Sequence, residues 1–172
     1  MKIFAVSGLS NTGKTTVVCA LVRELKGRGF SVATVKSSSC QDISFGAKDC
    51  DTGLHAAFGA EQTALRWPGG TAVFYRPAVK LADILAQFSQ DIVILEGFAS
   101  SAVPKIITVA AFTDLTVKKF CNGFAFSGVL AGTGVVSATL PLLNCFTQIK
   151  ELADLALQMA WTGDVQDWRE KL

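Results

Sequence analysis

Five runs of apolar and β-branched residues recur along the chain. They lie at residues 2–7, 31–36, 91–95, 105–109 and 124–131. Each run is nearly continuous, without the apolar–polar alternation of a strand that has one face in water. Strands of this kind are buried on both faces, as in a mostly parallel sheet flanked by helices. The pattern therefore predicts an α/β fold.

Apolar residues at helical spacing occupy stretches between these runs. The first stripe lies within residues 17–25, and Gly27 or Gly29 supplies the left-handed stop that often ends a helix. Segments 77–88 and 146–159 carry similar stripes, and residues 48–58 form a further predicted helix. The resulting order of strand, loop, helix and strand is typical of α/β folds.

The remaining segments complete the predicted architecture. Residues 63–67 and 71–75 flank a Pro-Gly-Gly turn and predict a short hairpin or edge extension near 61–76. The polar end from residue 162 is expected to fray. A length of 172 residues suits one domain, so we predict a single domain over 1–172.

Composition narrows the class of protein. Half of the residues are hydrophobic and 17% are charged, with a net charge of +2 that forms no basic stripe, which disfavours nucleic-acid binding. No apolar run reaches the roughly 18 residues that span a membrane, so we expect a soluble, cytoplasmic protein. Five cysteines without a C-x-x-C pair fit reduced thiols, and Cys40, Cys50 and His55 match no zinc spacing.

The strongest motif lies between the first strand and the first helix. Residues 8–15 read GLSNTGKT and satisfy the P-loop pattern G-x-x-x-x-G-K-[ST] in its required context. Inward N–H groups and the helix dipole would bind phosphates there. Lys14 is expected to reach the β and γ phosphates, Thr15 a Mg²⁺ ion and Thr16 the α phosphate. The loop residues predicted to bind the nucleotide are Gly8, Ser10, Asn11, Thr12, Gly13, Lys14, Thr15 and Thr16.

A P-loop also needs an acidic residue at the tip of a neighbouring strand. Glu96 follows four apolar residues and should emerge at the carboxyl end of a central strand, where α/β sheets bind ligands. We predict Lys14 and Glu96 as the catalytic pair and Thr15, Asp42 and Glu96 as the metal ligands. Lys36 closes the second strand and is expected to pair with Glu96, with Asp42 or with a phosphate.

Several motifs together resemble the MobB family, which acts in molybdopterin guanine dinucleotide biosynthesis. They are the P-loop, the strand 31–36, the segment Ala47-Lys48-Asp49, the pair Gly59-Ala60 and the stretch 91–98 that ends Glu-Gly-Phe. A Pro-Lys-Ile strand at 104–106 and a Leu-Pro turn at 140–141 continue the likeness. The segment after Lys36 departs from the family pattern, because it lacks histidines and carries one carboxylate, Asp42.

The resemblance implies a GTP-binding adaptor with Mg²⁺ and at most slow GTPase activity. It also implies a homodimer that assists a molybdopterin guanylyltransferase (MobA-like), or a molybdoenzyme maturation partner. By the same resemblance, Lys48 and Asp49 belong to a mobile loop near the nucleotide or the partner, and both are predicted nucleotide-binding residues.

Alternatives remain open on the residues alone. No Asn-Lys-x-Asp segment specifies guanine, although the loop 132–134 after the last strand is a candidate reader of the base. An ATP-dependent kinase or ligase of the dethiobiotin synthetase type shares a strand-first P-loop and a lysine that ends the second strand. A regulatory or metallochaperone NTPase is the third class.

Overall fold

The computed structural model describes residues 1–38, 51–111, 113–114, 121–134, 137, 139–169 and 171–172. The chain divides into two compact units. One consists of Met1–Ser38 and Phe88–Leu172, and the other is Ser39–Gln87. Each unit is described by itself.

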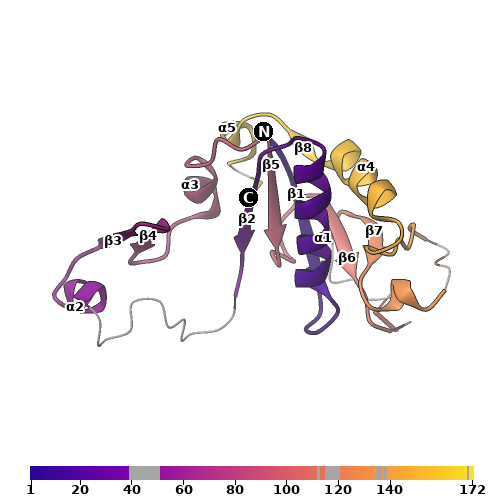
Figure 1. Cartoon of the computed structure of the whole chain (residues 1–172), viewed down its shortest axis with the longest axis horizontal. Helices are drawn as coiled ribbons and strands as arrows, with labels where there is room; N and C mark the ends of the chain where they lie inside the picture. Colours follow the sequence, from indigo (N-terminus) through magenta and orange to yellow (C-terminus); the bar gives the residue numbers. More distant parts are fainter. Residues whose placement is uncertain (39–50, 112, 115–120, 135–136, 138, 170) are drawn as a thin grey trace. The chain divides into compact units, whose positions relative to one another are not determined.

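The larger unit is built on a mostly parallel sheet. Five parallel strands lie in the order β2-β5-β1-β6-β7, which Figure 1 shows from left to right. Their bounds are β1 Lys2–Gly8, β2 Val32–Lys36, β5 Ile92–Glu96, β6 Lys105–Thr108 and β7 Gly123–Ser127. A short sixth strand, β8 (Trp161–Thr162), pairs antiparallel with the start of β1. The α/β prediction is confirmed.

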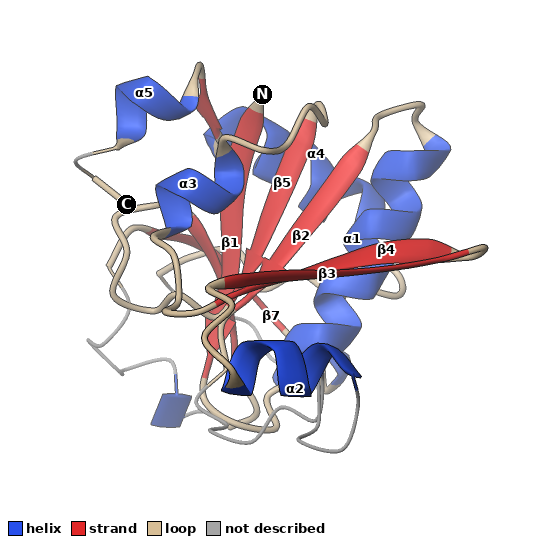
Figure 2. Cartoon of the chain, turned by 90° about the vertical axis from the view of Figure 1, so that its left-hand side faces the viewer, coloured by secondary structure: helices blue, strands red, loops and turns tan. Residues whose placement is uncertain are grey.

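Two helices cover one face of this sheet, as Figures 1 and 2 show. They are α1 (Lys14–Gly27) and α4 (Ile149–Met159). Their buried side chains, among them Leu21, Leu25 and Leu152, form one core with Phe4 and Ile94 of the central strands. Because alternate residues of β1 and β5 on the opposite face are buried as well, these strands read as continuous apolar runs.

The smaller unit contains a helix, a hairpin and a second short helix. Helix α2 spans Asp51–Ala57, strands β3 (Gln62–Trp67) and β4 (Gly70–Tyr75) pair antiparallel, and α3 spans Leu81–Leu85. The hairpin confirms the expectation for residues 61–76. Helix α3 is shorter than the predicted 77–88, because Lys80 keeps an extended conformation at its N-cap.

The chain end is more ordered than its polarity suggested. Asp164 and Asp167 form a capping box at helix α5 (Val165–Trp168), and Val165 and Trp168 are buried. The expectation of a frayed end from residue 162 was therefore wrong. The buried side chains of Val165 and Trp168, one helical turn apart, pack this end of the chain against the rest of the unit. No helix within the described residues is both long enough and apolar enough to cross a membrane.

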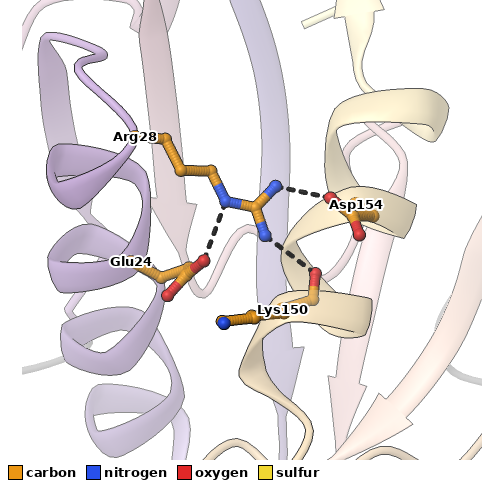
Figure 3. Close-up of polar contacts among 4 residues, drawn as sticks. All are labelled: Glu24, Arg28, Lys150 and Asp154. Carbon is orange, nitrogen blue, oxygen red and sulfur yellow. Dashed lines mark hydrogen bonds and ion pairs between the residues drawn. The ribbon is translucent and has the colours of Figure 1, made fainter.

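A polar contact ties α1 to α4 at the end of α1 farther from the P-loop. Figure 3 shows the Arg28 guanidinium between the two helices, where its Nε donates to Glu24 Oε1 at 2.8 Å. Its two terminal nitrogens donate to Asp154 Oδ1 at 2.5 Å and to the Lys150 carbonyl at 3.0 Å. The hydrogen bond to Asp154, with that to Glu24, raises the pKa of Arg28.

Arg28→Ala is expected to lower the free energy of unfolding by about 1 kcal/mol, because the contact is partly exposed and screened by solvent. Arg28→Lys should restore only part of that loss, since one ammonium cannot reproduce the planar fork. Urea unfolding measures both variants, with Arg23→Ala as the control that removes a charge from the same helix. An equal loss in Arg23→Ala would show that charge alone matters.

Candidate functional site

The P-loop connects β1 to α1 as the motif predicts. Gly13 is the N-cap of α1 and adopts a φ of 93°, a left-handed conformation that favours glycine. The amide of Val17 donates to the Gly13 carbonyl at 3.0 Å, which starts the helix. Asn11 also has a positive φ, of 59°, a conformation that asparagine tolerates better than most residues. The loop thus turns sharply at two points before α1 begins.

A buried hydroxyl pair fastens the loop to strand β6. The Thr12 hydroxyl lies 2.6 Å from the Thr108 hydroxyl and donates to the Leu9 carbonyl at 2.8 Å. The Thr108 hydroxyl also lies 3.2 Å from the Ser7 carbonyl oxygen. Thr12 is 2% exposed. Its backbone belongs to the loop, and its buried side chain holds the loop against β6. Sequence reasoning missed Thr108, whose only signal was its position at the carboxyl end of a predicted strand.

Close packing at the same point requires a glycine. A Cβ atom on Gly8 would lie 2.2 Å from the Thr108 hydroxyl and 2.4 Å from the Thr108 carbonyl oxygen. No real Cβ makes such contacts, so Gly8 allows β6 and the loop to meet.

The side chain of Lys14 folds over the mouth of the loop. Its Nζ donates to the Leu9 carbonyl at 2.6 Å and to the Gly8 carbonyl at 3.2 Å. These carbonyls hold the ammonium beside the loop's amide groups, where an anion would bind. Lys14 therefore provides a positive charge at the place where the motif predicts phosphate.

Glu96 lies at the centre of a polar cluster formed by the ends of strands β5 and β2 and the first turn of α1. Its Oε1 accepts from the Thr15 hydroxyl at 2.8 Å and from Lys36 Nζ at 2.8 Å. Strand register explains the meeting, because Glu96 is aligned with Val6 of β1 on one side and with Lys36 of β2 on the other. The Glu96 side chain is 9% exposed, whereas the Lys36 side chain is 59% exposed. Of the three pairings expected for Lys36, the structure contains the one with Glu96.

Hydrogen bonds from Ser7 and Lys105 hold the segment that follows Glu96. Gly97 has a φ of 96°, and its carbonyl accepts a hydrogen bond from the Ser7 hydroxyl. Farther along, the buried Lys105 donates to the carbonyls of Ser101 at 2.5 Å and Val103 at 2.7 Å. Burial lowers the pKa of Lys105. Its role here is to hold the 97–104 segment, and sequence reasoning treated it only as part of a strand.

These groups surround one open cavity of about 520 Å³ within the larger unit. The lining residues are those of the loop together with the strand tips: Ser10, Asn11, Gly13, Lys14, Thr15, Thr16, Lys36, Glu96 and Val129. Six further residues predicted to bind the nucleotide or the metal thus share a cavity with Glu96 and Lys14. Gly8 and Thr12 do not line the cavity, but they pack the loop against Thr108 of β6. A cavity with two lysines, loop amides and hydroxyls suits a polyphosphate.

Three predicted site residues, Asp42, Lys48 and Asp49, lie outside the described residues. The same holds for Cys40 and Cys50. His55 is exposed on α2 in the smaller unit. Within the described part of the chain, no group of three His, Cys, Asp or Glu side chains is arranged to hold a metal ion.

Comparison with known proteins finds a matching family model and similar solved structures. A family model described as "MobB: Molybdopterin guanine dinucleotide synthesis protein B" matches residues 3–120. Comparison with curated proteins finds no match.

Solved structures share the fold. "Structure of Bacillus subtilis MobB" is 22% identical with a TM-score of 0.71, and the match covers 95% of this chain and 100% of that one. "X-ray crystal structure of MobB protein homolog from Bacillus stearothermophilus" is 22% identical with a TM-score of 0.66, covering 90% and 97%. A third, "Crystal Structure of molybdopterin-guanine biosynthesis protein B (mobB)", is 20% identical with a TM-score of 0.71, covering 91% and 98%.

Proposed function

The chain belongs to the family of molybdopterin guanine dinucleotide synthesis protein B, and on that premise we propose that it is a GTP-binding adaptor. Its role is in molybdopterin guanine dinucleotide biosynthesis, and the family implies nucleotide binding. One observation supports the proposal above the others: Lys14 and Thr15 of the P-loop line a single cavity together with Glu96, which lies far along the sequence. GTP would place its phosphates in this cavity.

The residues present fit a magnesium ion. The Thr15 hydroxyl and the Glu96 carboxylate, 2.8 Å apart, are hard oxygen donors of the kind that Mg²⁺ takes alongside water and phosphate. A bound Mg²⁺ would neutralise part of the phosphate charge. Lys36 would continue to neutralise part of the charge of Glu96. Lys14 would exchange the Gly8 and Leu9 carbonyls for phosphate oxygens.

Slow hydrolysis fits the same cavity. Among its described lining residues, the basic side chains are Lys14 and Lys36, and there is neither an arginine nor a glutamine. P-loop proteins with fast turnover place such a group against the transferred phosphate. We therefore propose an adaptor with weak GTPase activity that assists another enzyme.

Calorimetry of the full chain tests the nucleotide assignment. In Mg²⁺ buffer, GTP is expected to bind more tightly than ATP, with hydrolysis slower than about one per second. Tight ATP binding without GTP binding would refute the assignment. ADP release that depends on a small-molecule acid would instead support an enzyme of the dethiobiotin synthetase type.

The proposed partner is a molybdopterin guanylyltransferase (MobA-like) or a molybdoenzyme maturation protein, met in the cytoplasm by a homodimer of this chain. Capture from a cytoplasmic extract, with Lys14→Ala as the nucleotide-free control, tests the partner. Light scattering on the purified chain tests the homodimer. Capture of neither protein class would contradict the adaptor role.

Glu96→Gln is expected to weaken GTP binding in Mg²⁺ about tenfold and to leave binding in EDTA unchanged. The amide keeps the shape of the side chain but removes the charge that faces the metal. The measurement is a calorimetric titration at fixed GTP and varied Mg²⁺.

Asp91→Asn is the matched control for that variant, because Asp91 precedes the opposite end of the same strand, β5, and its carboxylate bonds Ser31. It should leave the Mg²⁺ dependence unchanged. Equal loss of affinity with and without Mg²⁺ in Glu96→Gln would contradict a metal role.

A further inference from the structure

A second, smaller cavity lies next to the phosphate cavity in the same unit. Its volume is about 230 Å³, and Gly13, Thr16 and Val129 line both cavities. The second cavity, unlike the phosphate cavity, is also lined by Gly132, Asn144 and Phe146. Phe146 lines another open cavity as well, of about 540 Å³, beside α1. Thr16 is the residue predicted to contact the α phosphate, which carries the nucleoside, and it lines both cavities. The two cavities therefore meet where the phosphate chain of a bound nucleotide would join its nucleoside.

The topology of the sheet places this cavity where α/β proteins bind ligands. Strand β7 ends at Ser127 and is followed by the loop through Gly128 and the short 3₁₀ helix Leu130–Gly132. Leu142 forms a parallel bridge with Phe126, which adds one more chain segment beside β7. Residues 144–146 follow that bridge. Two walls of the cavity, one formed by residues 128–132 and the other by residues 144–146, therefore lie beyond the carboxyl ends of neighbouring parallel segments.

The lining of the second cavity differs in charge from that of the first. Among the residues described there, none carries a charged side chain, and the set consists of glycines, small polar groups and apolar groups. The phosphate cavity has Lys14, Lys36 and Glu96. An uncharged cavity that continues from a charged one suits the neutral half of a nucleotide rather than a second anion.

Asn144 fastens the two walls to each other. Its Nδ2 donates to the carbonyl of Ala131 at 3.3 Å, on the β7 side. Its Oδ1 accepts from the backbone amides of Phe146 at 2.8 Å and Thr147 at 3.4 Å. Both polar atoms of the Asn144 side chain are thus hydrogen-bonded to the protein backbone. Asn144 is a positioning residue that sets the width of the cavity and the backbone of Phe146.

The large apolar side chain of Phe146 is exposed to solvent at the edge of the second cavity. It is 75% exposed, although its backbone amide is held by Asn144. An exposed aromatic ring at the edge of an uncharged cavity offers a stacking surface for a nucleobase. Covering the ring with a base would also remove its apolar surface from water.

We propose that this cavity receives the ribose and guanine base of the bound nucleotide, with Phe146 stacked on the base and Asn144 positioning both walls. The inference rests on the proposed function, because it assumes that GTP phosphates occupy the neighbouring cavity. It assigns the base to residues that the P-loop motif does not contain.

Phe146→Ala tests the proposal in the full chain. Calorimetry with GTP and with inorganic tripolyphosphate, which has no base, separates the two cavities. The expected result is a loss of GTP affinity of about tenfold or more, with tripolyphosphate affinity unchanged. Phe146→Tyr should retain GTP affinity, since the ring remains. Because Phe146 is exposed, its replacement should leave the fold intact.

Met159→Ala is the matched control, because Met159 is another exposed apolar side chain and lines neither cavity. GTP binding that Phe146→Ala leaves unchanged would overturn the base pocket and leave the proposed function standing. Equal losses for GTP and tripolyphosphate would overturn it as well. A wild-type protein that binds tripolyphosphate but no GTP would refute the proposed function itself, and the pocket with it.

Discussion

Lys14→Ala is expected to weaken GTP binding about a hundredfold, which corresponds to about 2.7 kcal/mol. Hydrogen bonds to charged groups contribute about 1.5–3 kcal/mol each, and the Lys14 ammonium is expected to reach two phosphates. Without it, the phosphate cavity retains the loop amides and Lys36, but Lys36 is already paired with Glu96.

The unfolding free energy should change much less than the affinity. In the structure, Lys14 donates to two loop carbonyls, one of them at an exposed position. Those carbonyls can bond water once the ammonium is removed. Urea unfolding of Lys14→Ala should therefore differ from that of the wild type by less than about 1 kcal/mol.

Lys26→Ala is the matched control for Lys14→Ala, because it removes the same charge from the last turn of the same helix. Its GTP affinity should equal that of the wild type. The comparison separates a phosphate contact from a general effect of net charge. Affinity lost equally in both variants, or retained in Lys14→Ala, would refute the role assigned to Lys14.

The fold could be predicted well from sequence wherever the pattern was local. The five parallel strands and the hairpin follow from continuous apolar runs and from the Pro-Gly-Gly turn. The stop of α1 followed too, since Gly29 has a φ of 91° just after the helix. The last strand was predicted to reach residue 131 but ends at Ser127, because Gly128 turns with a φ of 92°.

The site was predictable where strand order alone brings residues together. Glu96 and Lys36 end neighbouring parallel strands, so their meeting follows from the sheet. Thr108, Lys105 and Asn144 could not be predicted in the same way. Each acts through backbone carbonyls or amides that are close in space only after the loops have folded. A sequence pattern records side-chain types but does not record which carbonyl a hydroxyl or an ammonium will meet.

Gly128→Ala is expected to damage both stability and nucleotide binding, because two constraints coincide at this residue. Its φ of 92° disfavours any side chain, and a Cβ there would lie 2.3 Å from the carbonyl oxygen of Thr12 in the P-loop. That carbonyl also accepts from the Val129 amide at 3.3 Å. Since the oxygen belongs to the backbone, the whole loop would have to shift.

Gly29→Ala separates the two constraints. Gly29 has nearly the same φ, 91°, but a Cβ there would meet nothing within 4 Å. It should therefore cost about 1–2 kcal/mol of unfolding free energy from backbone strain alone. Gly128→Ala should lose at least about 2 kcal/mol more, within the range of a buried steric clash.

GTP affinity provides the second readout, measured by calorimetry at a temperature where both variants remain folded. Gly29→Ala lies at the far end of α1 and should bind GTP like the wild type. Gly128→Ala should bind at least about tenfold more weakly, because Thr12 holds the phosphate loop against β6. Equal stability losses in the two variants, or wild-type affinity in Gly128→Ala, would show that the loop accommodates a methyl group and that its position does not depend on this contact.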